Sequence, residues 1–436
     1  MRLSLARITV GADRRRAKAR SNAQVQSGAR AIHCCLQTMA PMRPCWAEIR
    51  TSSLEENFRF LAALAVKHAE LMAVVKSDAY GHSLALCAPA AVRAGAGWLG
   101  VTSVEEGVAA RAICEPISRP RILIMGGVFP GQGAAVIQHD LTAAVWEPWQ
   151  LHELEAAAQA AGLAPGSLPI HLEIDTGMSR QGVGLLNLEP LLARFTPASP
   201  LRLEAVMTHL FAADEADHRA TGEQLAELDR ALGRISAAGH FAEWLSVGNS
   251  ASLLASQAAV IAELAARHGM RALMRPGLAL YGVVPEFDPA FKEEPPSLVA
   301  ARASLKPVLS WKTRIVGVRS VSAGAAVGYN GTFVATEPMR LALIAAGYAD
   351  GLSRRLGNRL SVLVRGQRAP LVGRISMDQS VIDVTEIQGV EPGDEVVLLG
   401  IQGIETMSAC DYARAAGTIP WEIFTGIGPR VRRVAV

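Results

Sequence analysis

Between residues 70 and 285 the chain alternates short apolar runs with longer segments of helical spacing, and this alternation limits the choice of fold. Eight apolar runs have strand length: 71–75, 98–101, 121–125, 142–145, 170–174, 203–208, 245–247 and 272–274. Alanine- and leucine-rich segments such as 151–162 and 223–239 separate them. Eight strand–helix units in succession are typical of an α/β fold, the (β/α)8 TIM-type barrel. A doubly wound open sheet is the competing fold, but no GxGxxG turn follows a predicted strand to favour it.

The pattern of predicted secondary structure changes after about residue 295, where segments of helical spacing become rare. Strand-like runs punctuated by Gly, Asp and Asn occur at 309–321, 341–346, 360–364, 381–384 and 395–399. We therefore predict a barrel domain over residues 43–290 and a C-terminal, mostly β domain over residues 291–436. The alternating run 45–50 is a candidate for an N-terminal strand, so that residues 43–55 could pair with the β domain.

Composition sets a few further limits. The chain has 436 residues, of which 50% are hydrophobic, so two or three domains with a large core are feasible. The net charge of +3 is too small to argue for a nucleic-acid partner. The six cysteines are scattered, with no CxxC pair and no zinc-like spacing, which indicates a reducing compartment and no metal site. No apolar run reaches the length of a membrane span.

The first 42 residues read as a basic, disordered extension. The run Arg14–Arg20 is basic, and no hydrophobic region with a cleavage site follows it. The segment is either a transit peptide or the product of a misassigned start, with Met39 or Met42 as the true first residue. We favour the second interpretation.

Lys76 ends the first apolar run and precedes the polar, glycine-containing segment Ser77–His82. A lysine at the end of a buried strand loses its charge easily. Its free amine can then act as a nucleophile, as a base or as the Schiff-base anchor of an aldehyde cofactor such as pyridoxal 5′-phosphate (PLP). A surface lysine that merely closes a strand is commoner, so this interpretation needs support from the other strand ends.

Polar residues follow four other predicted strands, and each has an ordinary structural interpretation as a helix cap, a surface charge or a core residue. They are Asp175, Met178 and Arg180, then His209, then Asn249 and Ser250, and finally Arg275, Gly277 and Leu278. In a (β/α)8 barrel the carboxyl ends of all strands meet at one rim, where active sites lie. The coincidence at one rim predicts a site. The Ser250 hydroxyl and the backbone N–H groups of Gly277 and Leu278 could bind a phosphate there.

Five segments in order carry a resemblance: AVVKSDAYGH at 73–82, DTGMSR at 175–180, RPGLALYG at 275–282, GYADG at 347–351 and GRISMDQ at 373–379. Together they resemble alanine racemase, a fold-type III PLP enzyme. The resemblance runs from about Trp46 to the C-terminus. It implies a cytoplasmic PLP enzyme that interconverts L-alanine and D-alanine and supplies D-alanine for peptidoglycan.

The resemblance also implies roles for individual residues. Lys76 would carry PLP and act as one base, and Tyr329 would be the second base on the opposite face of the cofactor. Tyr329 would reach the site of a partner subunit, which implies a homodimer with shared active sites. Arg275 would face the pyridine nitrogen and keep it unprotonated, because a guanidinium scarcely gives up a proton. His209 would stack near the pyridine ring.

The remaining roles fall into three groups. The cofactor, including its phosphate, would be bound by Tyr80, Asn249, Ser250, Gly277, Leu278 and Trp421. The substrate carboxylate would meet Arg180 and the backbone N–H of Met377. Supporting positions would be Glu173, Asp175, Tyr348 and Asp378.

Two positions depart from the family pattern. Glu173 stands where many members have a carbamylated lysine, and we hypothesise that its carboxylate orients Arg180 without CO2. A purely structural barrel glutamate is the alternative. Trp421 stands where the family usually has a tyrosine that contacts the phosphate, so that contact is in doubt, and the larger ring could narrow the pocket for a small substrate.

Two other functions stay open. One is a racemase of the same fold that acts on other or broader amino acids. The other is a PLP-binding barrel without catalysis, which would not need a second base such as Tyr329. Fold-type III decarboxylases share the barrel and the lysine, but they lack the DTGM and SMDQ segments.

Overall fold

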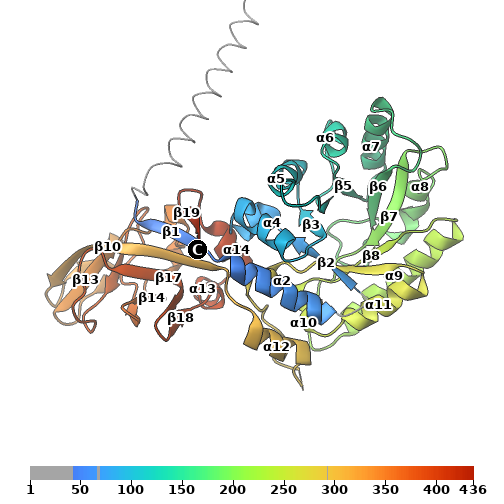
Figure 1. Ribbon diagram of the computed structural model, residues 1–436. Coiled ribbons are helices and arrows are strands. Elements are labelled where there is room, and N and C mark those ends of the chain that lie inside the picture. The colour runs from blue at the N-terminus through green and yellow to red at the C-terminus, as the bar shows by residue number, and fades with distance from the viewer. Residues whose placement is uncertain (1–42, 66–68, 292) are drawn as a thin grey trace, which may run out of the picture. The chain divides into compact units, whose positions relative to one another are not determined.

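The computed structural model describes residues 43–65, 69–291 and 293–436, and Cys45–Val436 form one unit of the chain (Figure 1). The predicted disordered extension, residues 1–42, lies outside the described residues.

Eight parallel strands close into a barrel, which confirms the predicted fold and excludes the open sheet. In chain order they are β2 (Ala69–Val74), β3 (Trp98–Val101), β4 (Arg121–Ile124), β5 (Thr142–Val145), β6 (Leu168–Glu173), β7 (Leu201–Met207), β8 (Trp244–Ser246) and β9 (Arg271–Met274). β2 pairs with β9 to complete the ring. The strands are buried almost throughout, as expected for a parallel sheet with side chains inside it and helices outside it.

Large side chains fill the barrel interior, so the barrel is a packed core and not a pore. Met72, Trp98, Leu123, Trp244 and Leu273 belong to this inner cluster, and each is at most 2% exposed. The space for ligands therefore lies at an end of the barrel and not along its axis.

Helices cover the outside of the barrel (Figure 1). The longer ones are α2 (Thr51–Ala65), α4 (Leu84–Arg93), α5 (Val104–Cys114), α7 (Pro148–Ala160), α9 (Arg219–Ala237) and α11 (Ala258–Arg267). The shorter ones are α3 (Lys76–Tyr80), α6 (Gly133–Gln138), α8 (Leu188–Leu192), α10 (Ser250–Leu254), α12 (Pro296–Ser304), η2 (Leu185–Asn187) and η3 (Leu278–Tyr281). In α9 the buried residues recur every three or four positions, which puts one apolar face against the strands.

A nine-stranded sheet forms most of the C-terminal part. Its strands are β1 (Cys45–Ile49), β10 (Leu309–Val321), β13 (Met339–Ile344), β14 (Ser361–Val364), β15 (Gln367–Pro370), β16 (Ser380–Asp383), β17 (Glu395–Gln402), β18 (Glu405–Met407) and β19 (Arg432–Ala435). β1 pairs antiparallel with β10 and parallel with β19. The N-terminal strand thus belongs to the C-terminal sheet, as its alternating pattern indicated.

The same region holds two helices that the sequence analysis did not predict, α13 (Ala409–Ala416) and α14 (Pro420–Gly426). A capping box of Ser408 and Asp411 starts α13, and Pro420 occupies the first position of α14. The remaining short elements are β11 (Ala326–Val327), β12 (Phe333–Val334), η4 (Tyr329–Gly331), η5 (Tyr348–Asp350) and η6 (Arg354–Leu356).

α14 packs on the turn that follows β2. The rings of His82 and Phe424 lie 4.7 Å apart, and a Cβ at Gly81 would clash with the Phe424 carbonyl. The close approach explains the glycine, and it brings the β domain to the end of the barrel where Lys76 lies.

Candidate active site

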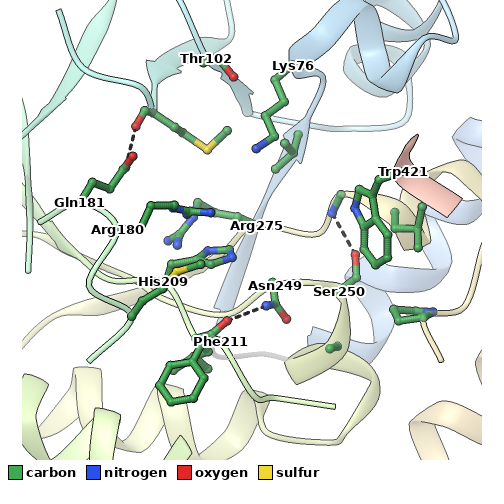
Figure 2. Close-up of a pocket in the computed structure, with 18 of the residues that line it drawn as sticks. Lys76, Thr102, Arg180, Gln181, His209, Phe211, Asn249, Ser250, Arg275 and Trp421 are labelled. Carbon is green, nitrogen blue, oxygen red and sulfur yellow. Dashed lines mark hydrogen bonds between the residues drawn. The ribbon is translucent and has the colours of Figure 1, made fainter. Parts of the chain in front are cut away.

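A cavity of about 800 Å³ opens at the carboxyl ends of the barrel strands (Figure 2). The predicted site residues that line it come from strand ends and following loops and from α14. They are Lys76, Tyr80, Glu173, Met178, Arg180, His209, Asn249, Ser250, Arg275, Gly277, Leu278 and Trp421. The strand-end rule predicted the members of this set between Lys76 and Leu278 that follow strands, whereas Tyr80, Glu173 and Trp421 were predicted from the family resemblance.

Lys76 directs its amine into this cavity (Figure 2). Burial lowers the pKa of Lys76, the neighbouring cations Arg180 and Arg275 lower it further, and only Glu106 acts in the opposite direction. A lowered pKa increases the share of free amine, which is the state needed for nucleophilic attack or proton abstraction.

The backbone directly after Lys76 is unusual. Ser77, Asp78, Ala79 and Tyr80 all have φ between 53° and 56°, so they form a left-handed turn without a glycine until Gly81. Such a conformation costs roughly 1–2 kcal/mol per residue, so the surroundings must hold it.

Arg275 is the buried cation of the site, with an exposed fraction of 5%. Its guanidinium donates to the Ser246 hydroxyl at 2.7 Å and to the Thr208 carbonyl at 2.7 Å. Burial lowers the pKa of Arg275 to about 10, while Glu173 opposes this shift, so the side chain stays charged at neutral pH. These bonds fix Arg275 below Lys76 in Figure 2.

His209 lies beside Arg275 and Arg180 (Figure 2). Burial, followed by the charges of Arg275, Arg180 and Lys76, lowers the pKa of His209 to about 3. The imidazole is therefore a neutral, flat ring at neutral pH and is suited to stacking.

Ser250, Gly277 and Tyr80 form the part of the cavity suited to an anion. The Ser250 hydroxyl oxygen accepts the backbone N–H groups of Gly277 at 3.0 Å and Ala279 at 3.1 Å. A Cβ at Gly277 would clash with the Tyr80 hydroxyl, so only glycine leaves the backbone open here. Both N–H groups are engaged by the Ser250 oxygen, so the hydroxyl hydrogen of Ser250 is a donor that remains for a phosphate in this space.

Asn249 acts as a helix cap as well as lining the cavity. Its side-chain oxygen accepts the Ser252 N–H at 3.0 Å, and its amide nitrogen donates to the Leu210 carbonyl at 3.2 Å. The structural interpretation of this residue therefore holds alongside its place at the rim.

Glu173 is a buried carboxylate in the cavity wall, and only 2% of it is exposed. Its carboxylate accepts a hydrogen bond of 2.6 Å from the Gln181 amide, which also donates to the Met125 carbonyl at 3.1 Å. Burial raises the pKa of Glu173, while this hydrogen bond and the charges of Arg275 and Arg180 oppose the rise. Among the described residues Glu173 and Arg180 form no direct ion pair, so the two act on each other through charge.

Asp175 does not line the cavity. Its carboxylate accepts the N–H groups of Gly177 at 2.9 Å and Ser179 at 3.0 Å. It thereby shapes the loop that carries Arg180, which is a supporting position.

Four predicted positions lie in the β domain and outside the cavity of this chain. Tyr329 is 65% exposed, Met377 54% and Tyr348 42%. The Tyr348 and Met377 loops are adjacent, because the Ala349 N–H donates to the Met377 carbonyl at 3.0 Å. Asp378 pairs with Arg430.

The sequence analysis missed three residues that hold this site together. Gln181 is the partner of Glu173, Glu106 bonds the backbone after Lys76, and Gln224 binds the His209 carbonyl at 2.9 Å. Of the three, Glu106 alone could have been found from the sequence, because Ser103 and Glu106 have the spacing of a helix N-terminus.

Within the described residues, no helix is both long and apolar enough to cross a membrane. No cluster of three or more potential metal ligands occurs in that part of the chain either. Fold and site together define a (β/α)8-barrel enzyme with a lysine of lowered pKa at its rim, beside the space around Ser250, Gly277 and Tyr80 that we call the anion cradle.

Comparison with known proteins gives a consistent result. The family model of the alanine racemase N-terminal domain matches residues 49–285, and that of the alanine racemase C-terminal domain matches residues 308–435. The chain belongs to the alanine racemase family and is therefore an isomerase.

Several relatives resemble it over almost their whole length. The alanine racemase of Symbiobacterium thermophilum is 39% identical over 90% of this chain and 97% of its own. The alanine racemase of Streptomyces lavendulae has a crystal structure with a TM-score of 0.80 and 36% identity, covering 91% of this chain and 98% of that one. The Bartonella henselae enzyme, with covalently bound pyridoxal phosphate, gives a TM-score of 0.75 and 28% identity, covering 90% and 99%.

Proposed function

We propose that this chain interconverts L-alanine and D-alanine with PLP bound through Lys76, and that the D-alanine serves peptidoglycan synthesis. The observation that carries the proposal is the convergence of the Lys76 amine, the Arg275 guanidinium and the anion cradle at Ser250 in one cavity. Relatives described as alanine racemases support the reaction, and the Bartonella henselae enzyme supports the cofactor.

The residues of the cavity fit PLP. The phosphate would be held by the Ser250 hydroxyl and the backbone around Gly277, where a side chain has no room. Tyr80 borders the same space, and the Trp421 indole adds a wall and a possible N–H donor. His209 offers a neutral ring for stacking, and Lys76 offers an amine whose pKa is lowered by burial.

PLP and the side chains around it would contribute different parts of the reaction. When bound, the cofactor supplies a conjugated ring that withdraws electrons from the substrate α-carbon. Two bases then move the proton: Nζ of Lys76 on one face and Oη of Tyr329 of the partner subunit on the other. One removes the α-proton while the other returns one, so each must be able to work as acid and as base.

Arg275, Arg180 and Glu173 set the charges around these bases. Arg275, still protonated at neutral pH, would face the ring nitrogen and keep it unprotonated. Arg180 would bind the substrate carboxylate together with the N–H of Met377 of the partner subunit. Glu173 would orient Arg180 through its charge, so activity is expected to be independent of bicarbonate.

A homodimer would complete the site. Tyr329 and Met377 are exposed on the β domain, and neither lines the cavity of its own chain. At the mouth of the cavity Phe211 is 50% exposed and Ile419 is 56% exposed, which leaves apolar surface for a partner to cover.

The reaction is tested by incubating the PLP-loaded protein with each L-amino acid in turn and measuring the D-product. Alanine is expected to give the highest rate, whereas equal rates with larger amino acids would favour a broad-range racemase. Absence of D-product from every amino acid would reject racemisation.

Subunit sharing is tested by mixing inactive variants. Lys76→Ala and Tyr329→Phe homodimers should each be inactive, but in a mixed dimer one site would carry both intact bases. Random exchange is expected to restore about a quarter of wild-type activity, because half the dimers are mixed and each has one good site of two. No recovery on mixing, despite exchange shown by a tag, would refute a shared site.

A further inference from the structure

The left-handed turn after Lys76 needs bonds from outside itself. Four consecutive residues, Ser77 to Tyr80, adopt the conformation that L-amino acids avoid. The turn would relax if nothing held it, and the backbone of Lys76 would move with it.

Glu106 holds the start of this turn. One carboxylate oxygen accepts the Ser77 N–H at 2.6 Å, and the other accepts the Thr102 N–H at 2.8 Å. Ser77 directly follows Lys76, while Thr102 directly follows β3, the neighbour of β2 in the barrel. Among the described residues, Glu106 is the side chain that bonds the peptide next to Lys76.

The position of Glu106 is itself fixed. It lies in the first turn of α5, where the Ser103 hydroxyl accepts its backbone N–H at 3.3 Å. A carboxylate at a helix N-terminus is favoured by the helix dipole, which helps to hold the Glu106 side chain at this place.

Glu106 also differs in charge from its surroundings. The groups that act on Lys76 from the facing loops are Arg180 after β6 and Arg275 after β9, both cationic. His209 after β7 interacts with Lys76 as well, and it is neutral at neutral pH. Glu106 on α5 is the one group whose charge raises the pKa of Lys76 among these described neighbours.

We propose that Glu106 is a positioning residue for Lys76: it ties the peptide after Lys76 to the end of β3 and places a negative charge beside the amine. This inference rests on the proposed function, in which Lys76 binds the cofactor and moves the proton.

The test compares Glu106→Gln with Glu105→Gln in the full-length protein. Gln keeps the size and one acceptor oxygen but removes the charge. Glu105 is the matched control, because it is the adjacent residue and its exposed carboxylate bonds Gln132, Ser103 and its own backbone N–H, and not the peptide after Lys76. The protein is first freed of cofactor, and Lys76 is acetylated across a pH series and quantified in its own peptide by mass spectrometry.

The midpoint of Lys76 reactivity is expected to move to lower pH in Glu106→Gln and to stay at the wild-type value in Glu105→Gln. Release of the turn would displace Lys76 before the cofactor binds, so PLP binding is expected to be at least about tenfold weaker. Glu106→Asp, which keeps the charge, should retain a midpoint nearer that of the wild type than the Gln variant does.

An unchanged midpoint in Glu106→Gln would overturn the proposal, and so would an equal shift in Glu105→Gln. A Glu106→Gln protein that fails to fold would make Glu106 a residue of the fold and would overturn it too. The lysine midpoint needs neither cofactor nor substrate, so it stays informative if the wild-type protein does not racemise alanine.

Discussion

Arg433 offers the sharpest test of how the β domain supports the site. This β19 residue is half-buried, and its guanidinium donates to four backbone carbonyls. The acceptors are Gly81 at 2.9 Å, Gly428 at 2.7 Å, Val431 at 2.7 Å and Ile427 at 2.6 Å. Gly81 closes the left-handed turn after Lys76, so Arg433 ties that turn to the C-terminal end of α14.

We expect Arg433→Met to destabilise the cofactor-free protein by about 3 kcal/mol. Four charge-assisted bonds at about 1.5–3 kcal/mol each set an upper limit well above this value, but water can replace part of them because the site is half-buried. With an unfolding entropy of about 2 cal/mol/K per residue over roughly 400 residues, 3 kcal/mol corresponds to a melting-temperature loss of about 4 °C.

The assay is thermal unfolding by circular dichroism, followed by PLP titration. Arg432→Met is the matched control, since Arg432 is the preceding residue of the same strand and is exposed. PLP should bind more weakly to Arg433→Met than to the wild type, because the released turn carries both Lys76 and Tyr80. Arg432→Met should bind PLP like the wild type. Melting temperatures of the two variants within about 1 °C of each other would refute this account of the clamp.

Four further outcomes follow from particular contacts. Burial lowers the pKa of His82 to about 4, so the unfolded chain takes up a proton on acidification before the folded protein does. The free energy of unfolding should therefore fall by about 2 kcal/mol between pH 7.5 and 5. In urea titrations this fall should be smaller for His82→Gln. Ser77 has a φ of 54°, so Ser77→Gly should have a free energy of unfolding about 1 kcal/mol higher than Ser77→Ala. The reverse order would argue against backbone strain at Ser77. Gly277→Ala should weaken PLP binding about tenfold or more through its clash with Tyr80, whereas Gly184→Ala, in open space, should bind normally. Trp421→Tyr should change PLP affinity or the KM for alanine; unchanged values for both would remove Trp421 from the site.

The sequence predicted the barrel well because burial on both faces leaves a simple pattern. Parallel strands covered by helices appear as short, continuous apolar runs, and every predicted run overlaps a strand of the barrel. The β domain was predicted from runs at the places of β10, β13, β14, β16 and β17. Its helices α13 and α14 were not predicted because they are short, 8 and 7 residues. The buried face of α13 has helical spacing, but it consists mostly of alanines, which give a weak hydrophobic signal.

The site residues that follow barrel strands could be predicted from the sequence, whereas the residues that are positioned by tertiary contacts could not. The strand-end rule places Lys76, His209 and Arg275 at one rim without knowledge of any contact. The partner of Glu173 could not be found this way. Gln181 lies beside Glu173 because the loop folds back on β6, with the Val183 N–H donating to the Glu173 carbonyl at 2.8 Å.

The turn after Lys76 shows most clearly why local sequence is insufficient. Of Ser-Asp-Ala-Tyr only Asp visits the left-handed region with any frequency, and then as a single residue, so in isolation these four residues would leave it. The conformation persists because Glu106 bonds its start, the Leu84 N–H bonds the Asp78 carboxylate at 2.6 Å, and Arg433 bonds its end.

This turn gives the site two groups from one short segment. Lys76 at its start supplies the amine, and Tyr80 at its end borders the anion cradle against Gly277. Tyr80 is locked by its ring contact with Tyr281, 5.0 Å between centroids, and Tyr281 donates to the Val74 carbonyl at 2.9 Å just before Lys76. Because both ends are tied to the same strand, the spacing of amine and cradle is a property of the folded chain alone. The bound cofactor would therefore meet a preorganised site, and variants that loosen the turn should weaken cofactor binding before they unfold the barrel.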